Sequence, residues 1–490
     1  MKKMFTRLFS TALLTGLILA GVTVKAQTTS LNSDAATTTT APESVTAEQK
    51  AEAKAEQKAK AEDKATVKKE NKAAEDTSWK PQRRIWGYAF GDLYYDAHAD
   101  KGGRGGESNY AGVPTGRNAF QLRRVYLGYD YEINKRFKAQ LLLSTEPTAN
   151  TSPATLTSVS TTTITGAAGV TGKTTTTTTT TIPNGDNLAD NKMAFFIKNI
   201  NLRYRDLFEG TDLVVGEMST PGFALNEPGT NAPTTLSENV WSYRSVERTI
   251  TDFHKNNSYD LGAALQGTFD VKTKNFGYVA MVANNSTSSL LSAANANTGF
   301  YKIFYGDLWG KFLNKKLVVD FYADYAKTGA ATYALGPQEH NMFKAFAAYT
   351  TPKLTVGVEA YTQKIANGIS DATTKIGENA TVNALSIFAR GAIVKDKIGF
   401  FARFDTYNPD KDYNGSTSYT VNTNYGSYTP VVKEKFYTAG LDFTPAKGVH
   451  FMPNIWLIDF KDNRDATTAG YVTGDHTLVY RATFYYVFGK

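Results

Sequence analysis

The chain has 490 residues, with 54 Lys and Arg against 46 Asp and Glu, and it has no cysteine. The absence of cysteine excludes disulfide frameworks, thiolate metal sites and cysteine nucleophiles. The formal net charge of +8 is mild for this length, so nucleic-acid binding has no support in the charge balance.

Residues 1–26 have the pattern of a secretory signal peptide. A basic start precedes an apolar stretch from Leu8 to Val22, and small residues end the segment at Ala26. A membrane anchor is the alternative, but the stretch is broken by hydroxyl residues and is shorter than the ~20 residues of a spanning helix. We predict export and cleavage after Ala26. Cleavage lowers the formal charge from +8 to +4, because it removes four basic residues, Lys2, Lys3, Arg7 and Lys25.

Two further segments precede any strand pattern. Residues 27–46 are rich in Thr, Ser and Ala and have the composition of a disordered linker. Residues 47–76 are rich in Ala, Lys and Glu and indicate a helix or coiled coil on the periplasmic side. Alanine fills the core positions of a coiled coil weakly, and lysines four residues apart repel. A solvated spacer, a short oligomerising coil and a tether to the cell wall all remain open.

From residue 79 onward, apolar residues recur at every second position. In residues 317–325, Leu317, Phe321 and Tyr325 share one side, whereas Asp320 and Asp324 lie on the other. The same alternation occurs in "RRVYLGYDYE", "LTVGVEAY", "IGFFARFDTY", "FYTAGLDF" and "LVYRATFYYVF". Successive side chains of a strand point to opposite faces, so one face is apolar and the other is charged. Segments of about ten residues favour membrane-spanning strands over the shorter strands of a sandwich.

A sheet that crosses a bilayer must close, because its backbone groups find no water there. At about 25 residues for each strand and its connections, residues 79–490 predict roughly 16 strands, with 14 or 18 allowed. We therefore predict an all-β, transmembrane, antiparallel β-barrel in the cell outer membrane. Barrels of this size enclose an aqueous channel.

The alternating pattern is harder to interpret in the first strand and in the long inserts. Trp86, Tyr88 and Phe90 look lipid-facing, yet Asp92 falls on the same side, so the register of that strand stays open. The Thr-rich residues 147–187 predict a long extracellular loop, with a structured β-stack as the alternative. We expect this loop between a strand ending near Ser144 and one starting near Lys192. Two more polar loops are expected at Lys101–Asn118 and Asn408–Pro430.

Alternation also selects charged residues for the inner face of the barrel. Guanidinium groups in a narrow channel attract anions, because low-dielectric walls focus the field, and facing carboxylates oppose this. Ion pairs across neighbouring strands that only keep the interior hydrated are an equally open interpretation. The basic candidates are Arg124, Arg203, Arg205, Arg390, Arg403 and Arg481, and the acidic ones are Asp130, Asp320, Asp324, Glu359, Asp405 and Asp442.

The sequence shows no pattern of catalytic or metal-binding residues. The five histidines never pair at the spacing of a metal site, and no G-x-S-x-G nucleophile motif occurs. We therefore predict that the protein is not an enzyme and that it needs no metal or cofactor.

Three segments resemble the phosphate-selective porin O/P-like family of outer-membrane channels. "FQLRRVYLGYDYEINKRFKAQLLL" (120–143) resembles the family's F-x-L-R-R-x-x-x-G strand pair. "LRYRDLFEGTDLVVGEMSTPGFALNE" (202–227) with "SVERT" (245–249), and then "YDLGAALQGTF" (259–269), resemble the strands around its infolded segment. The resemblance implies a sixteen-stranded barrel, commonly a trimer. It also implies a constriction at or near Arg244, Glu247 and Arg248.

The leading hypothesis is a passive diffusion channel for small hydrophilic solutes, with a weak anion preference. Its expected partners are those solutes or anions, outer-membrane lipid and two further copies of the chain in a homotrimer. The alternative is a structural or adhesive barrel that the N-terminal helix tethers to the cell wall.

Overall fold

The structure is a computed structural model, and contacts divide the chain into two units, Met1–Thr77 and Ser78–Lys490. The predicted signal peptide, linker and helical segment lie outside the described residues. The structure describes residues 80–104, 110–145, 154–165, 171–182, 195–222, 249–255, 258–284, 301–330, 337–371, 377–413, 415, 419–421, 431–468 and 470–489.

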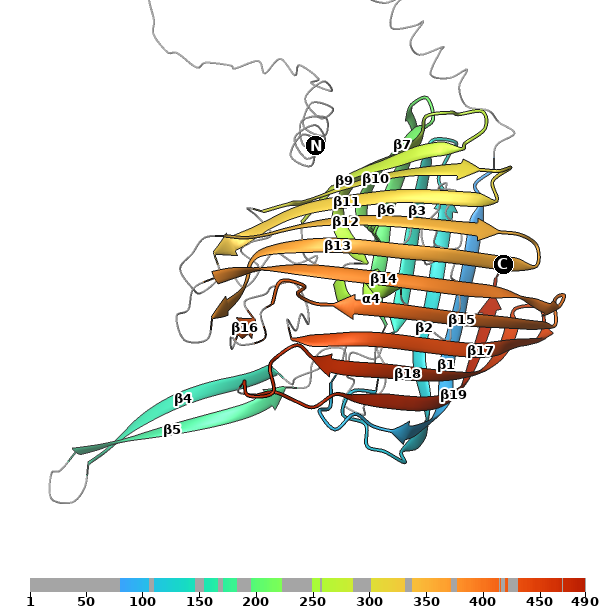
Figure 1. The fold of residues 1–490 in the computed structure, drawn as a ribbon. Coiled ribbons are helices and arrows are strands. Elements are labelled where there is room, and N and C mark those ends of the chain that lie inside the picture. The colour runs from blue at the N-terminus through green and yellow to red at the C-terminus, as the bar shows by residue number, and fades with distance from the viewer. Residues whose placement is uncertain are drawn as a thin grey trace, which may run out of the picture. The chain divides into compact units, whose positions relative to one another are not determined.

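Sixteen strands form the wall of an antiparallel barrel, as the sequence predicts (Figure 1). A seventeenth strand of the same sheet, β16 (Tyr419–Val421), has three residues and pairs with the end of β13. The wall strands are β1 (Arg83–His98), β2 (Asn118–Glu132), β3 (Phe137–Thr145), β6 (Phe196–Phe208), β7 (Thr211–Ser219), β8 (Tyr259–Thr268), β9 (Phe276–Ala283), β10 (Ile303–Phe312), β11 (Leu317–Ala330), β12 (Pro337–Thr350), β13 (Leu354–Asp371), β14 (Gly377–Val394), β15 (Ile398–Asn408), β17 (Val432–Ala446), β18 (Val449–Asp462) and β19 (Asp475–Phe488).

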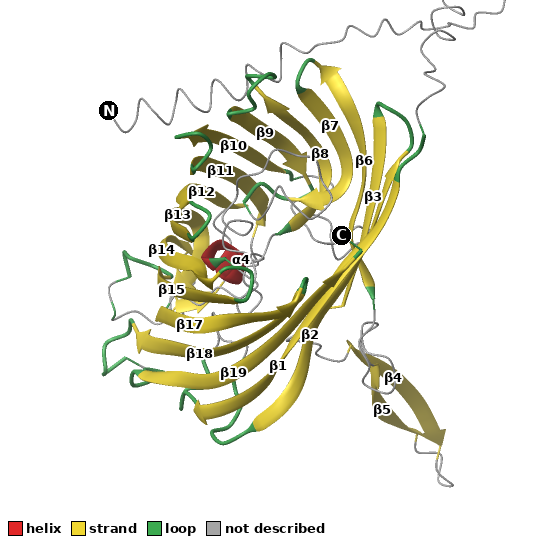
Figure 2. Ribbon diagram, turned by 90° about the vertical axis from the view of Figure 1, so that its right-hand side faces the viewer, coloured by secondary structure: helices red, strands yellow, loops and turns green. Residues whose placement is uncertain are grey.

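The barrel closes where the first strand meets the last. β1 pairs with β2 on one side and with β19 on the other, over a register that runs from Gly87 opposite Phe488 to His98 opposite Leu478. Closure gives every wall strand two neighbours, so the sheet has no open edge. Figure 2 shows the closed ring of strands. Among the described residues, no helix is long and apolar enough to cross a membrane.

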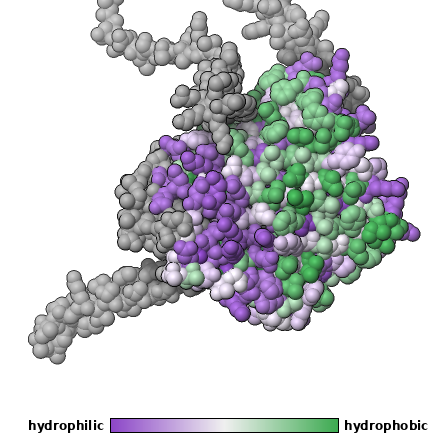
Figure 3. Space-filling model, in the orientation of Figure 1, coloured by the Kyte–Doolittle hydropathy of each residue, from purple (hydrophilic) through white to green (hydrophobic). Residues whose placement is uncertain are grey.

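The outer surface of the barrel is apolar and the inner face is charged. On β11, Phe321 and Tyr325 are 60% and 40% exposed, whereas Tyr322 and Asp324 between them are buried. In Figure 3 the apolar surface covers the middle of the strands, and polar surface gathers toward the end that carries the long connections. A closed barrel with an apolar outer belt is the architecture of outer-membrane proteins, and it places this chain in an outer membrane.

The connections alternate between short and long. Turns of two to seven residues, such as 313–316, 351–353 and 395–397, join strands at one end of the barrel. The other end carries long connections, including 99–117, 220–258 and 463–474. Short turns face the periplasm in outer-membrane barrels, so the long connections lie on the extracellular side.

The register of the first strand, which the sequence left open, places its aromatic residues inside the barrel, so their lipid-facing appearance was misleading. Trp86, Tyr88 and Phe90 are buried and lie on the same inner face as Asp92, while Ile85 and Leu93 are exposed on the outside. The rings pack against one another and against Tyr126 of β2, so they fill the interior instead of contacting lipid.

A β-bulge changes the face of one arginine on β2. The pairing of β1 with β2 passes from Phe90–Arg124 directly to Gly91–Leu122, which leaves Arg123 as the extra residue. Simple alternation puts Arg123 on the apolar side of the strand, and this was wrong. Arg123 is 2% exposed, because the bulge turns it inward beside Arg124.

The Thr-rich insert is structured, contrary to the leading prediction of a loop. β4 (Ala154–Thr165) and β5 (Thr171–Ile182) pair with each other in a separate two-stranded sheet. The β-branched threonine side chain favours an extended backbone, which explains why this polar segment forms strands. The insert does lie between two wall strands, β3 ending at Thr145 and β6 starting at Phe196.

Candidate functional site

One side of the barrel interior is dominated by carboxylates, and we call it the acidic wall. It comprises five buried residues from β8, β10, β11 and β13, namely Asp260, Asp307, Asp320, Asp324 and Glu359. Strand register explains why they gather. Tyr322 lies opposite Asp307, and Trp309 lies opposite Asp320, so the two carboxylates occupy diagonal positions on one face of neighbouring strands.

Lys344 on β12 is the one lysine buried within this wall, in the part of the chain that the structure describes. It lies between Tyr322 and Tyr361 in the strand register. Its Nζ atom is 4.0 Å from Glu359 and 5.5 Å from the centre of the Tyr322 ring. The neighbouring Asp324 accepts a hydrogen bond from the Tyr322 hydroxyl and lies 3.3 Å from His340. Among the described residues, the acidic wall therefore has more carboxyl groups than basic side chains.

The opposite side of the ring, around the meeting of β19 with β1 and β2, is dominated by cations. We call it the basic wall. Strand order puts β19, β1 and β2 half a turn of the barrel from β10 and β11, as Figure 2 shows. From there the basic wall continues through β3 to β6, which lies two strands from β8. Its buried cations are Arg123, Arg124, Lys138, Lys198, Arg203 and Arg481, against the buried carboxylates Asp92, Asp96 and Asp130.

Asp92 on β1 is the centre of a buried ion network in the basic wall. Its Oδ2 atom lies 2.6 Å from Nε of Arg123 and 2.7 Å from Nη2 of Arg481. The hydroxyl of Thr483 donates to the other carboxylate oxygen. The Arg481 guanidinium also stacks over the Trp456 ring, 4.0 Å from its centre. One carboxylate thus holds two arginines from strands on either side of it, β2 and β19.

The other predicted basic residues each have a different setting. Arg124 donates to the Tyr126 hydroxyl over 3.0 Å. Arg203 contacts Asp212 at 2.9 Å, and the half-buried Arg205 contacts Glu132 at 2.7 Å. Arg403 donates from Nε to both oxygens of Asp405, at 2.8 and 3.0 Å. Arg390 is only partly buried and lies opposite the inward-facing Phe401.

Two further predicted acidic residues have nearby partners, Asp130 within the basic wall and Asp442 outside both walls. Asp130 accepts from Gln140 over 3.2 Å and lies 3.9 Å from Lys138. Asp442, near the short-turn end, lies 2.9 Å from His450. Many of the predicted charges therefore have a partner of opposite sign within reach, as the ion-pair interpretation expects.

The connection between β7 and β8 enters the barrel. At its start, the carbonyl of Gly222 accepts a hydrogen bond of 2.8 Å from Lys344, several strands away on β12. A Cβ atom added to Gly222 would lie 3.0 Å from the Tyr322 ring, so only glycine fits there without a shift. The first residues of the connection therefore lie against the acidic wall.

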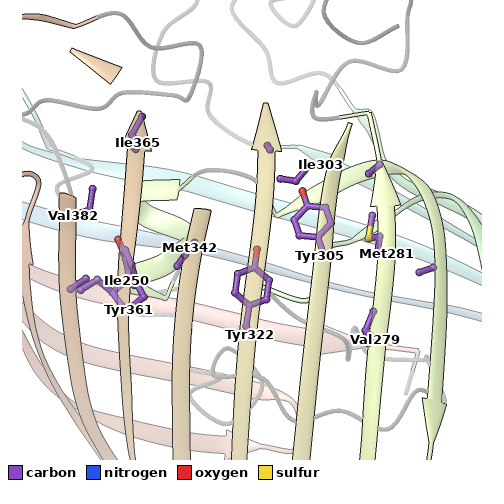
Figure 4. Packing of buried hydrophobic residues seen from close by; sticks show 14 of the residues in the cluster. Ile250, Val279, Met281, Ile303, Tyr305, Tyr322, Met342, Tyr361, Ile365 and Val382 are labelled. Carbon is purple, nitrogen blue, oxygen red and sulfur yellow. The ribbon is translucent and has the colours of Figure 1, made fainter. Parts of the chain in front are cut away.

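The end of the same connection forms α4 (Ile250–Lys255), which lies inside the ring of strands in Figure 2. The Thr251 hydroxyl donates to Glu359 of the acidic wall. Ile250 is fully buried in the apolar cluster that contains Met342, Tyr361 and Val382 (Figure 4). Burial of an isoleucine contributes about 1.5–3 kcal/mol, which anchors the helix to the wall.

The other face of α4 packs on β15 and β17. The Phe253 ring lies 6.4 Å from Phe436 and 5.9 Å from the Arg403 guanidinium. The imidazole of His254 stacks on the Tyr407 ring with 3.5 Å between centres. Contacts on β13, β15 and β17 fix α4 inside the barrel, where it narrows the interior.

Sequence reasoning found part of this arrangement. Arg244, Glu247 and Arg248 lie outside the described residues, directly before Thr249 and α4. Asp307 and Lys344 were missed, although the alternation in "IFYGDLWG" (303–310) puts Asp307 on the inner face. Nothing in the sequence pattern placed α4, because its position depends on strands that are more than 90 residues away.

Comparison with known proteins supports the barrel fold. No family model matches the sequence, and no curated protein matches it. The outer-membrane channel DcaP of Acinetobacter baumannii is similar in structure, at 8% identity and a TM-score of 0.50, covering 83% of this chain and 97% of that one. An anion-selective porin of Comamonas acidovorans shares 12% identity at a TM-score of 0.47, covering 84% and 100%. OmpF of Salmonella typhi shares 12% at 0.46, covering 82% and 97%. The likeness to DcaP shows the same barrel fold.

Proposed function

We propose that the protein is a porin, a passive channel for small hydrophilic solutes across the outer membrane. The observation that carries this proposal is a closed barrel whose interior has charged walls of opposite sign and is narrowed by α4. Passive diffusion needs no catalytic group, because the concentration gradient supplies the free energy and the narrowest region selects by size and charge. Export by the signal peptide at residues 1–26 is part of the proposal.

The two walls suit hydrated solutes. Fixed charges of opposite sign across a hollow produce a transverse field, and the low-dielectric wall concentrates it. Water and solutes with separated charges or strong dipoles align in such a field, whereas an apolar molecule displaces the water that solvates the wall charges and makes no polar contact in its place. This favours small polar and ionic solutes over apolar ones.

Selectivity between ions is proposed to be a weak preference for anions. The cations of the basic wall favour anions, while the five carboxylates of the acidic wall limit the preference. We assign the pore lining to Arg124, Arg203, Arg205, Arg390, Arg403, Arg481, Asp320, Asp324, Glu359 and Asp405. The resemblance to the phosphate-selective porin O/P-like channels adds Arg244, Glu247 and Arg248 at the constriction and a homotrimeric assembly.

Planar-bilayer recording of the purified protein tests the channel. We expect stepwise conductance and a reversal potential of small magnitude in a salt gradient, with the sign of anion selectivity. A structural or adhesive barrel would pass almost no current, and that result would exclude the channel. A reversal potential of cation sign would exclude the anion preference and leave the channel intact.

A second experiment tests whether α4 restricts the flow. Ile250→Asp puts a charge into the apolar cluster that anchors the helix, so we expect α4 to detach and single-channel conductance to rise. Ile393→Asp is the matched control, since Ile393 is exposed at the β14 end near a short turn. Equal conductance in the two variants would remove α4 from the narrowest region.

A further inference from the structure

Three side chains that commonly bind metals meet where the barrel closes. His98 is the last residue of β1, and Asp475 and His476 are the first two residues of β19. The Nε2 atom of His98 is 2.9 Å from Oδ1 of Asp475, and Nδ1 of His476 is 3.6 Å from the same oxygen. More than 370 residues of sequence separate the two histidines, so no spacing rule could bring them together.

The geometry is close to that of a metal site. One ligand atom from each residue can be chosen so that all three lie within 4.8 Å of one another. Ligands that lie ~2.1 Å from a zinc ion are about 3–3.5 Å apart. The two imidazole rings are stacked with 4.1 Å between centres, so both present nitrogen atoms near one carboxylate oxygen. Small side-chain rotations would suffice to admit an ion.

The backbone around the three residues holds them in place. A β-bulge between Asp96 and His98 re-aims the end of β1. The amide of Lys101 donates to Oδ2 of Asp475 over 2.9 Å, which orients the carboxylate and leaves Oδ1 toward the imidazoles. Outer hydrogen bonds of this kind fix the ligands of metal sites.

A second contact joins the connection that follows β1 to the residues before β19. The Arg104 guanidinium binds the carboxylate of Asp100 and donates to the carbonyl of Thr473 over 3.0 Å. The ends of β1 and β19 are thus linked on both sides of the cluster. A preorganised site needs little ordering when its ligand arrives.

The cluster is also open to ions. The side chains of His98, Asp475 and His476 are 35%, 13% and 41% exposed, at the end of the barrel with the long connections. In this group of described residues, His98 and His476 both lie near the carboxylate of Asp475. His340 and His450 each face a single carboxylate, Asp324 and Asp442.

We propose that His98, Asp475 and His476 bind one divalent transition-metal ion of the zinc, cobalt and nickel class. Two imidazole nitrogens and one carboxylate oxygen suit these ions, whereas calcium and magnesium prefer oxygen ligands alone. The remaining coordination positions face solvent and take water. Because the ligands come from the first and last strands, the bound ion stabilises the closure of the barrel.

Cobalt(II) is the probe for the experiment, since its visible absorption reports the coordination number. Untagged full-length protein in detergent is stripped with a chelator and titrated with Co²⁺. We expect a saturable visible band at one equivalent, displaced by Zn²⁺, and a rise in the thermal midpoint with Zn²⁺. His98→Ala and His476→Ala should each weaken Co²⁺ binding by at least ~10-fold. His450→Ala is the matched control and should bind as the wild type does.

Two results would overturn the proposal. One is the absence of a saturable band with the wild-type protein. The other is a band that survives in the His98→Ala/His476→Ala double variant, which would show binding elsewhere on the surface. Far-UV circular dichroism and heat-dependent gel mobility show whether each variant is folded. His98→Gln and His476→Gln retain a hydrogen-bonding side chain and replace the alanine variants if those do not fold.

Discussion

The acidic and basic walls follow the same strand alternation, but they compensate their charges differently. In the basic wall, side chains of the barrel strands themselves hold the cations, as in the network in which Asp92 holds Arg123 and Arg481. In the acidic wall, an infolded connection also contributes contacts: Glu359 lies near Lys344 and accepts from the Thr251 hydroxyl, and Lys344 donates to the Gly222 carbonyl. The basic wall is therefore built into the barrel closure, whereas the acidic wall is also contacted by the two described ends of the connection between β7 and β8.

The largest effect is expected from breaking the centre of the basic wall. Asp92→Asn keeps the shape of the side chain but leaves two buried arginines without their carboxylate. Removing one partner of a buried ion pair costs about 3–5 kcal/mol, so we expect a loss of this size in the free energy of unfolding. Denaturant titration in detergent measures it.

The control for this change is Asp412→Asn, because Asp412 forms an exposed pair with Lys411. Exposed pairs contribute little, so its unfolding midpoint should match the wild type. If Asp92→Asn also unfolds at the wild-type midpoint, the network does not stabilise the closure.

A smaller loss of stability is expected in the acidic wall. Lys344→Met removes the ammonium near Glu359 and the hydrogen bond to the Gly222 carbonyl. Hydrogen bonds to charged groups contribute about 1.5–3 kcal/mol, and we expect a destabilisation within that range. Lys327→Met is the control, since Lys327 pairs with Glu339 in an exposed setting. A destabilisation of Lys344→Met no larger than that of the control would contradict the role of Lys344.

Variants of the two walls are expected to shift the ion selectivity of the channel in opposite directions. Asp307→Asn/Asp320→Asn should raise the anion-to-cation permeability ratio roughly twofold, because it removes two carboxylates from the acidic wall. Arg124→Gln/Lys198→Gln should lower that ratio by a similar factor. Reversal potentials in a salt gradient give both values. Shifts in the same direction, or no shift, would show that the walls do not face the permeating ions.

The smallest effect is expected from the Thr-rich insert, which belongs to neither wall. Because β4 and β5 pair only with each other, replacing residues 147–194 with a short polar turn should change the unfolding free energy by less than about 0.5 kcal/mol. Single-channel conductance should also stay at the wild-type value. A variant that no longer folds, or conducts differently, would link the insert to the barrel.

Strand periodicity predicted the wall of the barrel because it is a local property. Phe321 and Tyr325 lie outside and Asp320 and Asp324 inside, as alternation alone requires. The same rule placed Arg403 and Asp405 on the inner face of β15. It left the face open where aromatic rings fill the interior, as with Trp86, and it failed where a bulge reverses the face, as with Arg123. Neither feature has a signal in a pattern of period two.

The sequence by itself determined that the chain forms alternating strands in sufficient number to close a barrel, because each strand carries its own two faces. The tertiary structure alone decided which charges meet. Asp92 reaches Arg481, and His98 reaches Asp475, only because the first and last strands pair. The position of α4 likewise depends on walls that exist only after closure. Contacts between such distant residues follow from strand order and register, which no local pattern encodes.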